Sequence, residues 1–153
     1  MLNSICFKSK FGWISAKEEN NIIISIFFGK SKNQGSSMVL KKLKKNLKNY
    51  FLGKKNVVFA NIYFNGSKLQ INIWKELVKI PYGKTKSYGE IAKIVNTSPR
   101  YVWNVCVQNK HLLDIPCHRV IRGDGSLGGF SGLGGLTLKR RLLRFENLKI
   151  WKY

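Results

Sequence analysis

Acidic residues are scarce in this sequence: 7 Asp and Glu stand against 28 Lys and Arg, giving a formal net charge of +21. The excess is even, with 12 basic minus 2 acidic residues (+10) in 1–67 and 16 minus 5 (+11) in 68–153. A field of this sign attracts polyanions, and nucleic acid is the commonest such partner. A general enrichment in lysine, or affinity for an acidic membrane surface, would give the same count, so charge alone does not decide the partner.

Cysteine and histidine are also few. The three cysteines are Cys6, Cys106 and Cys117, and the two histidines are His111 and His118. No Cys-x-x-Cys pair occurs, so the ligands are too few for a usual structural zinc site. An odd number of widely spaced cysteines also argues against a disulfide framework and for a reducing compartment. We therefore expect no metal.

Long apolar runs are missing as well. The longest lies within residues 22–28 and is too short to span a bilayer. The N-terminus lacks the basic region and apolar run of a signal peptide. With 44% hydrophobic residues the chain can still bury a core. We expect a soluble monomer without a membrane partner, not secreted, in the cytoplasm or associated with the nucleus or nucleoid.

The first part of the chain is predicted to be a small antiparallel sheet with a helix. Residues 5–28 have the pattern of a β-hairpin with a polar turn at 18–21. The predicted elements are strands at 11–14, 22–28 and 57–64 and a lysine-faced helix at 38–52. The turn at 65–67 suggests a boundary between an N-terminal α/β domain, residues 1–66, and a C-terminal domain, residues 67–153.

The second part is predicted to be helical, so the fold class is α+β. Ser87 with Glu90 has the spacing of a capping box, and Ser98 followed by Pro99 has the pattern of a helix start. The predicted helices cover residues 69–80, 88–95, 98–108 and 136–147. The middle two resemble a helix-turn-helix, a pattern of moderate specificity.

Two further features belong to this C-terminal domain. Seven glycines among residues 123–135 indicate a tight loop or wing. The outer face of the last helix is predicted to carry Lys139, Arg140, Arg141 and Arg144.

Cys117 lies between a proline and a histidine, in an apolar segment, residues 115–121, with the pattern of a strand. A buried cysteine that acts as a small hydrophobic residue is the common alternative. The basic neighbours His118 and Arg119 favour the thiolate, which is the nucleophilic form. Pro116 restricts the backbone that enters this segment.

The run Pro116-Cys117-His118-Arg119-Val120 resembles the active-site motif of the O6-alkylguanine-DNA alkyltransferases. The resemblance extends over residues 70–146, and more loosely to the hairpin. Its other motifs are Ile80-Pro81-Tyr82-Gly83-Lys84-Thr85, Ser87-Tyr88-Gly89-Glu90-Ile91-Ala92, Ser98-Pro99-Arg100, Asn109, and Lys139 to Glu146. Several motifs in the family's order make the resemblance specific.

The resemblance implies a role for each matched residue. Cys117 would accept the alkyl group, His118 would take its proton through a water, and Glu146 would orient His118. Asn109 would brace the turn that carries the cysteine, and Tyr88 would hydrogen-bond the extruded guanine. The implied reaction is irreversible, stoichiometric transfer of alkyl groups from O6-alkylguanine in double-stranded DNA, a DNA repair reaction, with O4-alkylthymine an open alternative substrate. The resemblance implies no cofactor either, because the alkylated base itself supplies the alkyl group.

The resemblance also implies how DNA is held. The two helices of the helix-turn-helix would enter the minor groove, and Arg100 would fill the gap left by the flipped base. The other predicted DNA contacts are Ser87, Ser98, Tyr101 and Asn104. The predicted guanine pocket consists of Val120, Leu127, Phe130, Ser131 and Gly132. Tyr101, Trp103 and Asn104 depart from the small residues usual in the family's recognition helix.

Each of these residues has a structural alternative. His118 fits a core histidine, Glu146 a surface ion pair, Tyr88 a helix aromatic, and Asn109 a helix C-cap. Three other functions also stay open: a lesion sensor without catalysis, a sequence-specific DNA-binding regulator, and a cysteine-histidine hydrolase. The presence of Cys117 disfavours the first, and stoichiometric labelling would separate all three from alkyl transfer.

Overall fold

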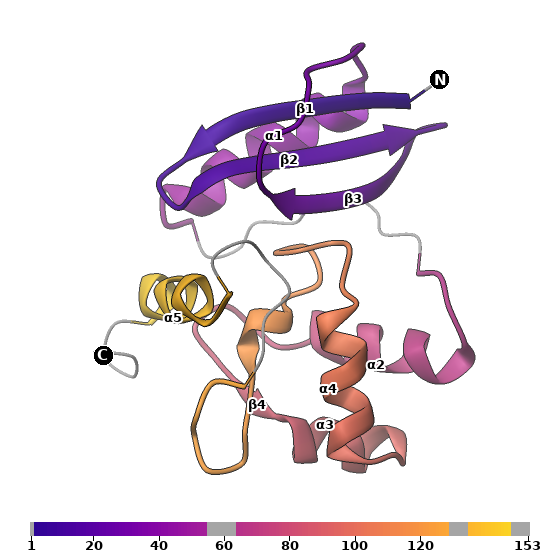
Figure 1. Ribbon diagram of the computed structural model, residues 1–153, viewed down its shortest axis with the longest axis vertical. Coiled ribbons are helices and arrows are strands. Elements are labelled where there is room, and N and C mark those ends of the chain that lie inside the picture. Colours follow the sequence, from indigo (N-terminus) through magenta and orange to yellow (C-terminus); the bar gives the residue numbers. More distant parts are fainter. Residues whose placement is uncertain (1, 55–63, 129–134, 148–153) are drawn as a thin grey trace. The chain divides into compact units, whose positions relative to one another are not determined.

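A computed structural model covers the chain (Figure 1), and the residues it describes are 2–54, 64–128 and 135–147. Contacts divide the chain into two units, Met1–Tyr63 with Lys110–Asp114, and Phe64–Asn109 with Ile115–Tyr153. The sequence did not predict that residues 110–114 belong with the first unit. The domain boundary after residue 66 stays a prediction.

The first unit contains a three-stranded antiparallel sheet in the order β1-β2-β3. Its strands are β1 (Leu2–Ser9), β2 (Gly12–Glu19) and β3 (Ile22–Phe28). Asn20 and Asn21 join β2 to β3 with φ of 53° and 65°, the left-handed conformation that a two-residue hairpin turn requires. The predicted hairpin is therefore β2-β3, and β1 adds a strand that the sequence analysis did not separate.

Helix α1 (Met38–Phe51) covers one face of this sheet (Figure 1). Leu40, Leu43 and Leu47 are fully buried, as their helical spacing predicted. The Ser37 side chain accepts a hydrogen bond from the backbone N–H of Leu40 and caps the first turn. The predicted helix is confirmed, whereas the strand predicted at 57–64 falls almost wholly outside the described residues.

The segment 110–114 adds to the edge of β3. The Ile26 N–H donates to the Lys110 carbonyl at 2.8 Å, and the Leu112 N–H donates to the Ile26 carbonyl at 3.1 Å. Asp114 follows at 8% exposure, with Oδ2 lacking a hydrogen-bond partner among the described residues. The peptide that leads to Cys117 is thus anchored to a strand of the first unit.

The second unit is mainly helical. Its helices are α2 (Lys68–Val78), α3 (Tyr88–Val95), α4 (Pro99–Val107) and α5 (Gly135–Glu146). Two short strands, β4 (Lys86–Ser87) and β5 (Val120–Ile121), pair in parallel. The N–H groups of Glu90 and Tyr101 donate to the hydroxyls of Ser87 and Ser98, confirming both predicted helix starts.

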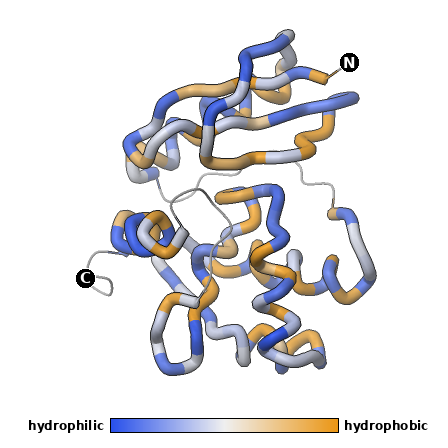
Figure 2. The backbone as a smooth tube through the Cα atoms, in the orientation of Figure 1, coloured by the Kyte–Doolittle hydropathy of each residue, from blue (hydrophilic) through white to orange (hydrophobic). Residues whose placement is uncertain are grey.

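Helix α5 corrects one prediction. Hydrophobic and hydrophilic residues alternate around it (Figure 2), and its three arginines are exposed. Lys139, predicted to point outward with them, is 0% exposed, so that prediction is wrong. The helical repeat explains the burial, because Lys139 is three residues before Leu142 and seven before Glu146, on the inner face.

The described ranges contain neither a membrane-spanning helix nor a cluster of metal ligands. No helix there combines the length and the hydropathy needed to cross a bilayer. No group of three or more His, Cys, Asp or Glu side chains is arranged to hold a metal ion in the same residues.

Candidate active site

Cys117 begins a 3-10 turn, Cys117–Arg119, rather than lying in a strand. The Cys117 N–H donates to the Ile115 carbonyl at 2.8 Å, and the Arg119 N–H donates to the Pro116 carbonyl at 3.0 Å. These bonds turn the backbone, so the strand expected over 115–121 is confined to β5 after the turn. Cys117 is 3% exposed and its neighbour His118 is 1% exposed.

Glu146, near the end of α5, is the centre of the polar network behind this turn. Its Oε2 lies 2.6 Å from His118 Nε2. Arg119 donates to both carboxylate oxygens, from Nε to Oε1 at 2.8 Å and from Nη2 to Oε2 at 3.0 Å. The Gly83 N–H also donates to Oε1, at 3.3 Å. The predicted pairing of Glu146 with His118 is therefore present, and the alternative of a surface ion pair is excluded.

The electrostatics of this network determine the histidine tautomer. Burial alone would raise the pKa of Glu146, but His118 and Arg119 outweigh burial and hold it far below its usual value. Burial lowers the pKa of His118 despite the nearby carboxylate, so the imidazole is neutral at pH 7. A carboxylate can only accept, so the proton is on Nε2 and Nδ1 keeps a free lone pair. Nδ1 is buried without a hydrogen-bond partner among the described residues.

The Cys117 thiol is buried, and its surroundings shift its pKa in both directions. Burial raises its pKa, while a hydrogen bond from the Asn109 side chain and the charge of Lys139 lower it. The raised value means that the resting group is a thiol, which needs a base to become a nucleophile. Arg119, expected to favour the thiolate, instead binds Glu146, so that part of the prediction is wrong.

Asn109 holds the two ends of the loop before the cysteine together. It follows α4 by two residues, and its Nδ2 donates to the Ile115 carbonyl at 2.8 Å. That carbonyl also accepts from Cys117, so the amide supports the turn directly. Asn109 is thus placed to brace the cysteine turn, as the family resemblance implied.

Lys139 is the functional candidate that the sequence analysis missed. Its ammonium donates to the Tyr88 hydroxyl at 3.2 Å and to the carbonyls of Val120, at 2.6 Å, and Leu127. Burial lowers its pKa to about 8, so it remains mostly charged at pH 7. The available signal was the spacing from Glu146, which places both residues on one helix face.

Tyr88, at the start of α3, faces this ammonium and is 4% exposed. Burial, followed by the cysteine charges, raises its pKa well above the usual value, so the phenol stays protonated. Gly128, with φ of +72°, allows this approach, because a Cβ there would lie 2.7 Å from the Tyr88 hydroxyl oxygen. The phenol accepts from Lys139 and retains its own proton for donation.

The predicted DNA contacts lie on or beside α3 and α4. The hydroxyls of Ser87 and Ser98 act as helix caps, Tyr101 and Asn104 are half-buried, and Arg100 is exposed. Of the predicted guanine pocket, Val120 and Leu127 are buried. Phe130, Ser131 and Gly132 lie outside the described residues.

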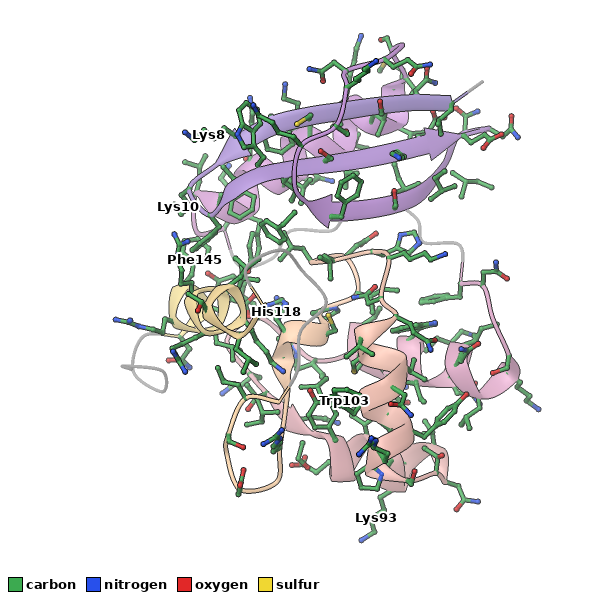
Figure 3. All side chains as sticks on the ribbon, viewed as in Figure 1. Lys8, Lys10, Lys93, Trp103, His118 and Phe145 are labelled. Atoms are coloured by element: carbon green, nitrogen blue, oxygen red, sulfur yellow. The ribbon has the colours of Figure 1, made fainter. Side chains whose placement is uncertain are left out.

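These features define a small α+β protein with a buried cysteine that is followed in the chain by His118 (Figure 3), which pairs with a buried glutamate, in a helical unit. Residues 68–148 match the family described as 6-O-methylguanine DNA methyltransferase, DNA binding domain. The chain belongs to this family.

Curated relatives support this assignment. The methylated-DNA–protein-cysteine methyltransferase of Sulfurisphaera tokodaii is 41% identical over 105 residues, covering 68% of this chain and 65% of that protein. The enzyme of the same name from Saccharolobus solfataricus is 36% identical over 149 residues, covering 94% of this chain and 95% of that protein.

Solved structures agree. The O6-methylguanine methyltransferase of Mycobacterium tuberculosis superposes with a TM-score of 0.84 at 27% identity, covering 97% of this chain and 94% of that one. A complex of the M. tuberculosis protein with DNA gives 0.81 at 27% identity, covering 95% and 93%. The α+β fold class is confirmed.

Proposed function

We propose that this protein repairs DNA by moving an alkyl group from O6-alkylguanine to the Cys117 sulfur, irreversibly and once per molecule. The observation that carries the proposal is the buried Cys117-His118-Glu146 arrangement, in which Glu146 holds the His118 proton on Nε2. Nδ1 is then the atom free to take the thiol proton, through a bridging water. The DNA-bound relative supports DNA as the partner, and that this DNA is double-stranded is part of the proposal.

The reaction balances without a cofactor. Loss of the Cys117 proton to His118 leaves a thiolate, whose electron pair forms a sulfur–carbon bond with the alkyl group. The bond between that carbon and guanine O6 breaks, and its electrons remain on the purine. Tyr88, a protonated phenol held by Lys139, donates a hydrogen bond to the departing base. The thioether has no carbonyl for water to attack, so the protein is consumed.

DNA recognition is assigned to residues 67–153, which we propose to be the DNA-binding and acceptor domain. O6 lies inside the base stack, so the nucleotide must leave the helix to reach a buried thiol. Arg100 is a cation in the first turn of α4, where the helix dipole disfavours it, and it fits a role in filling the vacated stack better than one in stability. We also propose that the protein acts as a monomer. The guanine pocket is proposed to be lined by Val120, Leu127 and residues 130–132.

The test is the intact mass after incubation with excess duplex DNA carrying O6-methylguanine. We expect a gain of one methyl group that stops at one per molecule and is absent in Cys117→Ala. Cys106→Ala, which removes another buried cysteine, is the matched control and should still gain the methyl. Lesion binding without a mass gain would identify a sensor instead, and release of product with turnover would identify a hydrolase.

A further inference from the structure

Helix α4 presents one face away from the core of its unit. Val102, Val105 and Cys106 are buried, whereas residues 100, 103, 104 and 107 are more exposed and follow the spacing of one helix face. An indole, Trp103, lies in the middle of this face (Figure 3). This face therefore combines a large aromatic surface with polar groups.

Arg100 and Trp103 form a pair on this face. The centre of the Arg100 guanidinium lies 5.5 Å from the centroid of the indole ring, within the range of a cation–π contact. The contrast with Trp74 is informative, because Trp74 is 7% exposed and packs in the core of the same unit. Arg100 is exposed and Trp103 is half-buried, so part of the indole remains open to a partner, unlike the indole of Trp74.

We infer that Trp103 is a DNA-contacting residue that stacks on a base beside the flipped nucleotide, entering the duplex together with Arg100. The inference rests on the proposed function, because α4 meets DNA only if this unit reads the lesion. A minor groove about 6 Å wide leaves no room for an indole lying across it. Bulky apolar side chains that bind there insert between base steps and unstack them.

This contact has a consequence for substrate choice. A wedge costs least where stacking is already weak, so the protein should prefer lesions beside a mismatch, which weakens stacking but keeps a base for the indole to stack on. The preference should depend on the Trp103 ring. Stacking on one base changes affinity on the order of 10- to 100-fold when the aromatic ring is removed.

The experiment compares wild type with Trp103→Ala in two reactions. The first is binding and single-turnover transfer with O6-methylguanine duplexes, with and without an adjacent mismatch. The second is transfer from free O6-benzylguanine, a probe that does not require DNA. Trp13→Ala is the matched control, since Trp13 is 37% exposed and carries Lys30 Nζ 4.7 Å from its ring centroid, in the first unit.

We expect Trp103→Ala to lower duplex affinity by about 10- to 100-fold. It should also abolish the preference for an adjacent mismatch and leave transfer from the free base unchanged, and Trp103→Phe should recover part of the loss. Unchanged or tighter duplex binding by Trp103→Ala would overturn the inference, as would equal losses in both reactions, which would indicate a structural role. Failure of wild type to transfer from either substrate would instead refute the proposed function.

Discussion

Replacing Glu146 by glutamine tests how the acceptor site is held. The change keeps the side-chain length but exchanges one acceptor oxygen for an NH2 donor. Arg119 donates to both carboxylate oxygens, at 2.8 and 3.0 Å, so the NH2 group meets a guanidinium N–H in either orientation. Removing one partner of a buried ion pair costs about 3–5 kcal/mol, and we expect the free energy of unfolding to fall by that amount.

The same variant should also impair chemistry. Glutamine keeps one acceptor oxygen, for which Arg119 and His118 compete. When Arg119 takes it, the NH2 group faces His118 and favours the tautomer with its proton on Nδ1, whose lone pair is then lost. General base catalysis contributes about 10²–10⁴-fold, which is the expected fall in the transfer rate. Urea unfolding and single-turnover transfer from a methylated duplex, at a temperature where the variant is folded, measure the two effects.

Glu76→Gln is the matched control, because Glu76 pairs with Lys79 at 2.9 Å, where the lysine side chain is 67% exposed. A surface pair of this kind contributes about 0–1 kcal/mol, and its loss should not change the transfer rate. A folded Glu146→Gln protein that transfers at the wild-type rate would refute the tautomer argument. Unchanged stability would refute the reasoning about the buried pair.

Two further substitutions test buried charges. Lys139→Met removes a charge that lowers the pKa of Cys117. Transfer should therefore slow at pH 7, and the curve of transfer rate against pH should shift to higher pH. Arg140→Met, at an exposed position of the same helix, is the control and should not shift the curve. Burial raises the pKa of Asp114 to about 7, so the folded state binds more protons and wild-type stability should fall between about pH 4 and 7. Asp114→Asn removes this loss, and urea unfolding should show little gain near pH 4 but about 2–4 kcal/mol at pH 8. An Asp114→Asn gain independent of pH would contradict this explanation, and Asp124→Asn, an exposed aspartate, should show no such gain.

What could be predicted from sequence was mostly local. The starts of α3 and α4 depend on Ser87 and Ser98 and on residues within three positions, so the printed sequence contains the whole signal. The family motif likewise placed Cys117, His118 and Glu146 together correctly. In the first case the contacting residues lie within three positions of each other in the chain, and in the second a specific sequence motif identifies them.

The failures share a physical cause, which is tertiary context. Lys139 was placed outward because charged residues are usually exposed, but carbonyls from elsewhere in the unit satisfy its ammonium. Arg119 was expected beside the thiol, yet a carboxylate 27 residues away binds it. The apolar pattern around Cys117 suggested a strand, whereas hydrogen bonds within the segment form a turn.

The separation in sequence of these contacts has a consequence for the order of folding. The bonds that begin α3 and α4 span three residues, whereas those of Glu146 reach back 28 residues to His118 and 63 to Gly83. Short loops close at lower entropic cost than long ones, so the helix pair can form while the chain is still being synthesised. Cys117 receives its proton acceptor in working form only when α5, the last helix described, packs into place. The nascent protein can therefore form the α3–α4 helix pair before it forms the His118–Glu146 pair on which the proposed transfer depends.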